Sequence, residues 1–302
     1  MITYDMIKRN ILLFLTFTGL YPEEFEFFLP FFKKSWEDYI IENRIKGKKR
    51  KRKYGGGSKA KLDKIENKLL FILIYVKLYP LQAVIGFMFG MSQAQANVWI
   101  HILSQVLKAA LAGLGELPER VPQNLEKILR EEGAEEISID ATEGRCQRPK
   151  DNEKQKQYYS GKKKTHTIKN NLIINNENRK VKYLSKTCEG KKHDKKICDE
   201  EQPTYPEGIT LNKDTGYQGY EPEGVITRQP KKKPRGGELT HFEKNQNSII
   251  SSTRIVVEHV ISGVKRCRIV KDVYRNTKEN FDDLVMEIAC GLHNFRTEHR
   301  KT

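Results

Sequence analysis

Residues 137–228 carry a series of short strand-like segments separated by turns, and a long helical segment follows them. Apolar residues at alternate positions, Ile137 and Ile139, predict a strand that ends at Asp140. Further strand-like segments lie at 166–174, 180–184, 209–211 and 225–228, and a charged helical stretch lies at 193–201. The valines and isoleucines of 256–264 then recur at helical spacing. This order predicts a mixed α/β fold for the second half of the chain.

Two acidic residues lie where predicted strands end, and a third lies on the helix that follows. Asp140 ends the first strand, and Asp214 lies between the apolar segment 209–211 and Gly216, which is typical of a strand running into a turn. Glu258 belongs to the helical segment. Two strand ends and one helix therefore supply three carboxylates.

The helix presents Glu258 together with two cations. Arg254, Glu258 and Lys265 are separated by four and seven residues, so at about 100° per residue they lie within roughly 40° of one another. The apolar stripe is centred roughly 100° away from them. The helix can therefore bury its apolar side while these three charges face a cleft.

Carboxylates at such positions suit hard divalent cations. Magnesium is commonly held by one or two carboxylates, with water and substrate phosphate completing its coordination. Three acids can hold two ions, and a pair about 4 Å apart serves in-line displacement at phosphorus, the chemistry of polymerases and nucleases. The alternative is coincidence, because any two aspartates and one glutamate among 39 acidic residues can be grouped into a triad.

Short motifs surround the three acids. They are Ile139-Asp-Ala-Thr-Glu143, Gln147-Arg-Pro-Lys150, Tyr158-Tyr-Ser-Gly-Lys-Lys-Lys164, Glu189-Gly190 with His193-Asp194, Asp214-Thr-Gly-Tyr-Gln-Gly219 and Pro230-Lys-Lys-Lys-Pro-Arg-Gly236. Together they resemble the DDE transposases of bacterial insertion sequences, in the IS-five family, which is related to the Harbinger-like transposases of eukaryotes. The resemblance covers nearly the whole chain.

This resemblance implies an RNase H-like catalytic domain and assigns roles to residues. The last signature of the family is an arginine, a glutamate three intervening residues later and a lysine six intervening residues after that. Arg254, Glu258 and Lys265 fit this spacing. By resemblance, Asp140, Asp214 and Glu258 are the catalytic, metal-binding acids, with two Mg²⁺ ions per site and Mn²⁺ able to substitute. Arg254 and Lys265 would contact DNA phosphates beside them.

Two further positions of the resembled pattern carry less weight. The family signature often places a tyrosine three residues before the arginine, where this chain has Ser251. A His-Asp pair similar to His193-Asp194 also occurs in the family, so the pair has a functional interpretation near the metal site. We favour a structural one, because an aspartate in the first turn of a helix is stabilised by the helix dipole.

The first third of the chain is predicted to be helical. Helices are expected at 62–79 and 81–89, and Gly90-Met91 is short enough for a tight turn. Ser92 and Gln95 then form a capping-box pattern at the start of a helix with one apolar face. This order is typical of a helix-turn-helix, although an ordinary helical hairpin remains an alternative.

In a helix-turn-helix the second helix enters the major groove through its early polar residues. The candidates for contacts with base edges are Gln93, Gln95 and Asn97.

The charge of the chain predicts a polyanionic partner. It carries 55 Lys and Arg against 39 Asp and Glu, a formal net charge of +16, and nucleic acid is the partner that such a balance favours. A basic run at 46–53 leads into Gly55-Gly56-Gly57 and predicts either phosphate contact or a solvated linker. The catalytic strands are flanked by further candidates for DNA contact, Lys162, Lys163, Lys231 and Lys232.

The predicted architecture is an all-α helix-turn-helix-type N-terminal domain followed by an RNase H-like domain with a mixed sheet and flanking helices. The expected boundaries are an N-terminal helical segment at 1–45, a basic linker at 46–61, the DNA-binding domain at 62–112, a linker at 113–123 and the catalytic domain at 124–302. With 302 residues the chain has room for two cores.

No segment of the sequence predicts a membrane or secretory role. The longest apolar stretch, 69–76, is far too short to span a bilayer, and the apolar run after Lys8-Arg9 is interrupted by threonines. Five cysteines without paired C-x-x-C spacing are typical of reduced thiols. We expect a soluble, cytoplasmic bacterial protein that associates with the nucleoid when it is bound to DNA.

The sequence therefore predicts a DNA transposase. It would bind the terminal inverted repeats of its insertion sequence and catalyse metal-dependent phosphodiester hydrolysis and strand transfer into target DNA. We expect a homo-oligomer on DNA, with neither a membrane nor a small-molecule substrate. Two alternatives stay open: a metal-dependent nuclease of the same fold that joins no strands, and a catalytically silent DNA-binding protein derived from a transposase.

Overall fold

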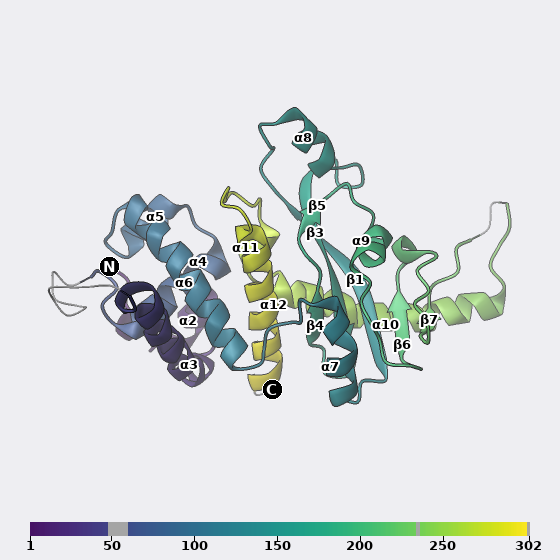
Figure 1. Cartoon of the computed structure of the whole chain (residues 1–302), viewed down its shortest axis with the longest axis horizontal. Coiled ribbons are helices and arrows are strands. Elements are labelled where there is room, and N and C mark those ends of the chain that lie inside the picture. The colour runs from purple at the N-terminus through teal and green to yellow at the C-terminus, as the bar shows by residue number, and fades with distance from the viewer. Residues whose placement is uncertain (48–59, 234–235, 301–302) are drawn as a thin grey trace. The chain divides into compact units, whose positions relative to one another are not determined.

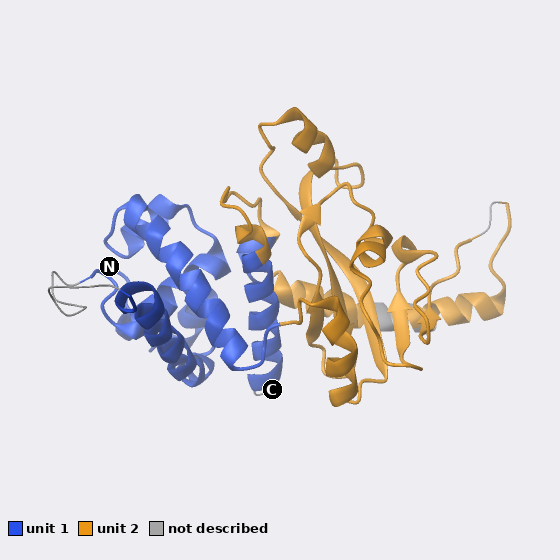
Figure 2. Cartoon of the chain, in the orientation of Figure 1, with its two compact units in different colours: residues 1–117, 266–270, 284–302 blue, residues 118–265, 271–283 orange. Residues whose placement is uncertain are grey.

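The computed structural model describes residues 1–47, 60–233 and 236–300, apart from the side chains of residue 249 and residues 251–254 in one helix (Figure 1). The chain forms two compact units (Figure 2). Unit 1 comprises residues 1–117, 266–270 and 284–302, and unit 2 comprises residues 118–265 and 271–283.

Unit 2 is built on a mixed seven-stranded sheet with the order β2-β3-β1-β6-β7, in which β4 and β5 also pair with β3. The strand β1 lies in the middle, antiparallel to β3 and parallel to β6, and β7 continues the parallel half. The strands are β1 (Glu136–Arg145), β2 (Tyr159–Ser160), β3 (Thr165–Asn175), β4 (Val181–Leu184), β5 (Cys188–Glu189), β6 (Thr210–Lys213) and β7 (Ile226–Arg228).

Helices cover this sheet on both faces. They are α7 (Leu125–Glu131), α9 (Asp194–Glu201) and α10 (His241–Val264), with 3₁₀ turns η2 (Pro122–Asn124) and η3 (Thr215–Tyr217). The short helix α8 (Asn152–Tyr158) precedes β2 in the segment between β1 and β3. The strand β1 alternates its side chains between the two faces. Ile137 and Ile139 join a buried core with Leu125 of α7 and Cys198 of α9. The intervening positions of β1 are polar, and α10 packs against this strand.

Unit 1 is helical. Its elements are α1 (Tyr4–Ile7), α2 (Ile11–Thr18), α3 (Pro22–Ile40), the π-helical turn η1 (Ile41–Ile45), α4 (Ile65–Leu78), α5 (Gln82–Met88), α6 (Gln93–Gly113), and most of α11 (Arg268–Lys271) and α12 (Phe281–His299). Residues 67–76 of α4 are buried on all sides, which marks α4 as the central helix of this unit. No helix in the described part of the chain is both long and apolar enough to cross a membrane.

The predicted helix-turn-helix is present at α5 and α6. The capping box forms as expected, since Ser92 Oγ accepts a hydrogen bond from the N–H of Gln95 at 3.3 Å and the Ser92 N–H donates to Gln95 Oε1 at 3.1 Å. Gly90 has a φ of +66°, a conformation that favours glycine in the turn. The glycine in the turn and the capping box at the start of α6 therefore account for where α5 ends and α6 begins.

Close packing of the turn on α5 leads to a first prediction. A Cβ atom at Gly86 would lie 2.8 Å from the carbonyl oxygen of Met91 and 3.3 Å from the backbone of Ser92, and backbone atoms cannot move aside as a flexible side chain can. We expect Gly86→Ala to lower the free energy of unfolding by about 1–3 kcal/mol. Gly113 is the matched control, because nothing lies within 4 Å of its Cβ position. Gly113→Ala should leave stability unchanged or raise it by about 0.4–1 kcal/mol. Urea unfolding compares the two variants, and equal stabilities would contradict the packing described.

The compact units divide the C-terminal part of the chain differently from the predicted boundaries. The sequence predicts a single domain from 124 to 302, whereas residues 266–270 and 284–302 pack with the helical unit. In α12, Phe295 packs edge-on against Phe28 of α3 at 5.3 Å, and Asn294 donates a hydrogen bond to the Glu116 carbonyl at 3.0 Å. An amphipathic pattern shows that a helix has a buried face but not which unit buries it.

Candidate active site

Asp140 and Asp214 lie on adjacent strands at neighbouring positions. The parallel pairing of β1 with β6 aligns Ile139 with Lys213, so the next residue of β1 is Asp140 and the residue directly after β6 is Asp214. Neighbouring strands are about 4.8 Å apart, so this register brings the two backbones close together at the carboxyl end of the parallel pair. Asp140 and Asp214 are both half-buried.

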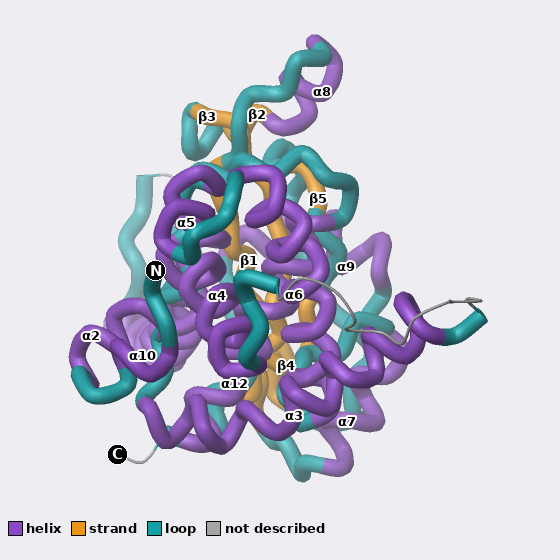
Figure 3. Tube along the Cα trace, turned by 90° about the vertical axis from the view of Figure 1, so that its left-hand side faces the viewer, coloured by secondary structure: helices purple, strands orange, loops and turns teal. Residues whose placement is uncertain are grey.

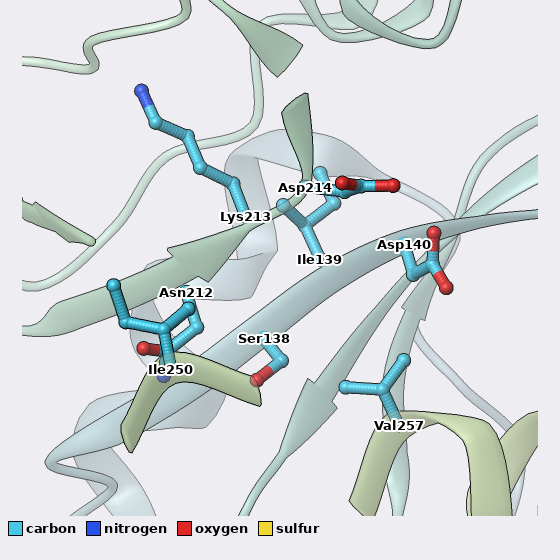
Figure 4. Close-up of a pocket in the computed structure, with 8 residues that line it drawn as sticks. All are labelled: Ser138, Ile139, Asp140, Asn212, Lys213, Asp214, Ile250 and Val257. Carbon is cyan, nitrogen blue, oxygen red and sulfur yellow. The ribbon is translucent and has the colours of Figure 1, made fainter. Parts of the chain in front are cut away.

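Both aspartates line one pocket between the sheet and α10 (Figure 4). Its other lining residues are Ser138, Ile139, Asn212, Lys213, Ile250 and Val257. Figure 4 shows Lys213 directed away from the two carboxylates, and its ammonium instead donates to the carbonyl of Tyr220 and pairs with Glu221. Lys213, although it directly precedes Asp214 in the chain, therefore does not neutralise the negative charge of the two aspartates.

Backbone contacts fix both aspartates. Asp140 Oδ1 accepts a hydrogen bond from the N–H of Ala141 at 2.8 Å, and Asp214 caps the turn η3 through the N–H of Thr215. The amide of Gln229 also donates to the Asp214 carbonyl at 2.7 Å. These bonds hold the two side chains in place on the backbone.

Glu258 lies on the helix that faces this pocket but does not line it. Its neighbour Val257 is 4% exposed and lines the pocket, while Glu258 is exposed. Successive residues of a helix differ by about 100° in direction, which accounts for the difference. Among the described residues, no three His, Cys, Asp or Glu side chains lie close enough to share one metal ion. The structure thus brings together two of the three predicted acids.

The pocket has the chemistry of a site for a hard cation. Two carboxylates at adjacent positions repel each other unless a cation lies between them, and oxygen donors are what divalent hard cations prefer. Asn212 also lines the pocket, but its amide nitrogen donates to Glu136 and to the carbonyl of Ile137 at the start of β1, and Figure 4 shows this amide apart from the two carboxylates. A divalent metal ion therefore fits the residues present.

A buried polar network anchors the turn that carries Asp214. Tyr217, three residues further on, is fully buried and donates its hydroxyl to Asn171 Oδ1 on β3 at 3.0 Å. Burial raises the pKa of the Tyr217 hydroxyl well above its ordinary value, so the group remains a donor. The amide of Asn171 donates in turn to the Asp194 carbonyl at 2.9 Å. This network ties Asp214 to the strand beside Asp140.

Asp194 has a structural partner. Its carboxylate lies 2.9 Å from the ammonium of Lys169, and it closely approaches Gly216, where a Cβ atom would lie 3.0 Å from Asp194 Oδ2. His193 precedes α9 as its N-cap but makes no side-chain capping bond. These contacts are those of a residue that supports the Asp214 turn.

Lys265 lies close to β1, as its predicted role requires. Its ammonium donates to the carbonyl of Glu143 at 3.5 Å. Burial lowers the pKa of Lys265, the nearby charge of Lys163 lowers it further, and Asp140 and Glu143 act in the opposite direction. The charges of Lys163 and Asp140 thus both act on the ammonium group of Lys265.

The remaining candidates for DNA contact are spread over the surface. Lys162 is exposed in the loop between β2 and β3. Lys231 pairs with Glu243 at 2.7 Å, and Lys232 donates to Gln218 at 3.2 Å. The side chain of Arg254 and the basic run at 48–53 lie outside the described residues.

On the recognition helix, Gln93 and Gln95 are exposed and Asn97 is half-buried. The side-chain oxygen Oε1 of Gln95 accepts the hydrogen bond of the capping box, so the side-chain nitrogen Nε2 is the donor that can contact a base edge.

Sequence reasoning did not identify Asn212, Asn171 or Tyr217. The only local signal for Asn212 is its position two residues before Asp214 on a strand, which places both side chains on the same face. Asn171 and Tyr217 are 46 residues apart, and only the folded sheet joins them.

The fold and the site combine a helix-turn-helix at α5 and α6 with two adjacent aspartates in a pocket on the sheet. Residues 139–294, just over half of the chain, match the sequence model of the DDE superfamily endonucleases. Residues 60–113 match the helix-turn-helix of DDE superfamily endonucleases. The chain therefore belongs to the DDE superfamily endonucleases, a family that uses divalent metal ions.

A curated relative supports the same assignment. The "Probable transposase for insertion sequence element IS702" of Microchaete diplosiphon is 28% identical over 263 residues, which cover 85% of this chain and 89% of the relative. No solved structure matches the chain.

Proposed function

We propose that this protein is a DNA transposase that cuts the ends of its own insertion sequence and joins them to target DNA. The observation that carries the proposal is the adjacent placement of Asp140, in the middle of β1, and Asp214, directly after β6, in one pocket that faces the Glu258 helix. The similarity to the IS702 protein over most of both chains supports transposition rather than another use of this chemistry.

The proposed metal ligands are Asp140, Asp214 and Glu258. Bound Mg²⁺ ions, two per site and replaceable by Mn²⁺, would lower the pKa of the attacking oxygen and neutralise charge on the leaving oxygen. Because Glu258 is exposed next to Val257, a small rotation of its side chain or of α10 is the step that would complete the triad.

The reaction consists of two displacements at phosphorus. Water first attacks the phosphodiester at the element's end, so a new P–O bond forms, the bond to the 3′ oxygen breaks, and a 3′-OH is left. That hydroxyl then attacks a target phosphodiester, forming the joint and releasing the target's own 3′-OH. No covalent protein–DNA intermediate is needed, and none of the chain's Ser or Tyr residues is assigned as a nucleophile.

The chain's cations position the DNA for these steps. Lys265, held at the Glu143 carbonyl near Asp140, would contact a phosphate beside the scissile one, and we assign the same role to Arg254 from the family signature. Gln93, Gln95 and Asn97 on α6 would read the terminal repeats, and a homo-oligomer would hold two ends together.

The proposal is tested with duplexes carrying the inverted repeats that flank the coding sequence, incubated with a supercoiled target plasmid and Mg²⁺ or Mn²⁺. We expect nicks at the repeat boundary and covalent joining of the repeat to the plasmid. Cutting without joining would support a nuclease of the same fold. Binding without cutting in either metal would refute catalysis and leave a DNA-binding protein derived from a transposase.

A further inference from the structure

One segment of unit 2 contains Lys162 and Lys163, but the other cations of this segment have no role in the site described above. Residues 147–164 connect β1 to β3 and include α8 and β2. In both Figure 1 and Figure 3 the helix α8 stands beyond the ends of the long strands of the sheet. We call residues 147–164 the α8 arm.

The α8 arm is strongly basic. It contains seven lysines and arginines against two acids, a much higher excess than the chain average. Its acids are already engaged, because Asp151 caps α8 through the N–H of Lys154 at 2.9 Å and Glu153 pairs with Lys156 at 2.8 Å. The basic residues of the arm that are exposed are Arg148, Lys150, Lys154, Lys156, Lys162, Lys163 and Lys164.

The α8 arm is anchored at both ends. At its base the N–H of Gln147 donates to the Tyr274 carbonyl at 3.0 Å, and β2 pairs with the start of β3. Near its other end the N–H of Lys191 donates to the Gln157 carbonyl at 3.1 Å, and Tyr159 packs edge-on against His166. An ordered basic surface loses little conformational entropy when it binds, so these charges are arranged in advance for a partner.

The α8 arm follows the carboxyl-terminal end of β1, the strand that carries Asp140. The strand β1 runs on for five residues beyond Asp140, paired with β3 as far as the register of Arg145 with Thr167, and the arm follows directly. At about 3.3 Å per residue, β1 ends roughly 17 Å from Asp140, the length of about five base pairs of DNA, and the arm begins two residues further on. Lys265 is held at the carbonyl of Glu143, on the part of β1 between Asp140 and the arm, and the charge of Lys163, which belongs to the arm, acts on it.

We propose that the α8 arm binds the phosphate backbone of duplex DNA on one side of the cleaved phosphodiester, at distances beyond about five base pairs from it. The inference rests on the proposed function, since the acids fix where the cleaved bond lies. Backbone contacts of this kind position DNA without reading its sequence.

The test measures DNA affinity as a function of salt, in the absence of divalent metal so that no cutting occurs. The arm variant carries Arg148→Gln, Lys150→Gln and Lys154→Gln. The matched control carries Lys127→Gln, Lys186→Gln and Lys196→Gln, which also removes three exposed cations from unit 2. We expect the arm variant to reduce the slope of log Kobs against log salt by about 2–3, because each lost phosphate contact contributes roughly 0.9, and the control to leave it nearly unchanged. Equal slopes for the two variants would overturn the proposal.

DNA length gives a second, independent readout. Duplexes are shortened to within about five base pairs of the cleavage point, on one side at a time. On one of the two sides, shortening should abolish the difference between the wild type and the arm variant. A difference that persists on both shortened duplexes would also overturn the proposal.

The outcome is distinguishable from failure of the proposed function. The arm residues are outside the acid pocket, so the arm variant at saturating protein should cut DNA as the wild type does. A wild-type protein that never cuts would refute the proposed function while leaving the salt slopes to decide the role of the arm.

Discussion

Asp140→Asn and Asp214→Asn should each abolish DNA cutting and joining, with rates reduced at least about a thousand-fold. Each substitution removes a negative charge but keeps a carbonyl oxygen of the same shape. That oxygen can still accept the hydrogen bonds from Ala141 and Thr215 that hold the two side chains. The local backbone is therefore expected to remain intact while the affinity for a divalent cation falls.

The control for these variants is Asp199→Asn. Asp199 lies on α9, is 45% exposed and pairs with Lys195 at 2.7 Å, so the same chemical change is made away from the pocket. It should keep full activity, because an exposed pair of this kind contributes at most about 1 kcal/mol to stability. Binding of the terminal repeats should also survive in all three variants. An Asp140→Asn protein that still cuts DNA at the wild-type rate would remove Asp140 from the mechanism.

The double variant Gln93→Ala and Asn97→Ala should lose recognition of the terminal repeats. A bidentate contact of an amide side chain with a base edge discriminates by about 1–3 kcal/mol, so losing two such contacts should weaken specific binding by roughly 30-fold or more. Binding to unrelated DNA depends on phosphate contacts and should change little. Gln95 is left in place because its side chain also caps α6.

Gln105→Ala is the matched control, since Gln105 is exposed on the same helix, about two turns beyond the last proposed base contact at Asn97. Affinities for the repeats and for a scrambled duplex of equal length and composition are measured by fluorescence anisotropy. If the double variant weakens binding to both duplexes equally, α6 contacts the backbone and another element reads the sequence.

Local patterns in the sequence predicted much of this fold. The capping box at Ser92 and the glycine at the turn define the helix-turn-helix through contacts between neighbours in the chain. The alternation of Ile137 and Ile139 likewise predicted the first half of β1 and the face that it buries. The predicted end of this strand at Asp140 was wrong, because β1 stays paired with β3 as far as Arg145. In both cases the signal and the structure involve residues only a few positions apart.

Features that depend on distant residues were not predictable in the same way. The alignment of Asp140 with Asp214 follows from the register of two strands more than 70 residues apart, and the sequence indicates only that each aspartate ends a strand. The contact of Tyr217 with Asn171 and the packing of α12 with unit 1 are also long-range. Helical spacing placed Glu258 on a face with Lys265, but the precise rotation of α10 decides that Val257 lines the pocket and Glu258 does not.

The helix α8 was not anticipated, although the motifs on either side of it were noted. Its seven residues carry no apolar periodicity, and an aspartate N-cap followed by charged residues is a weak signal in a sequence already rich in charge.

The central claim is that Asp140 and Asp214, with Glu258, bind the catalytic metal ions. Its most direct test is to count the Mn²⁺ ions bound to the protein on a repeat duplex, by electron paramagnetic resonance, in the wild type and in the Asp140→Asn, Asp214→Asn and Glu258→Gln variants. We expect two bound ions in the wild type and in Asp199→Asn, and the loss of at least one ion in each of the three variants. Unchanged stoichiometry and affinity in the Asp140→Asn and Asp214→Asn proteins would contradict the account.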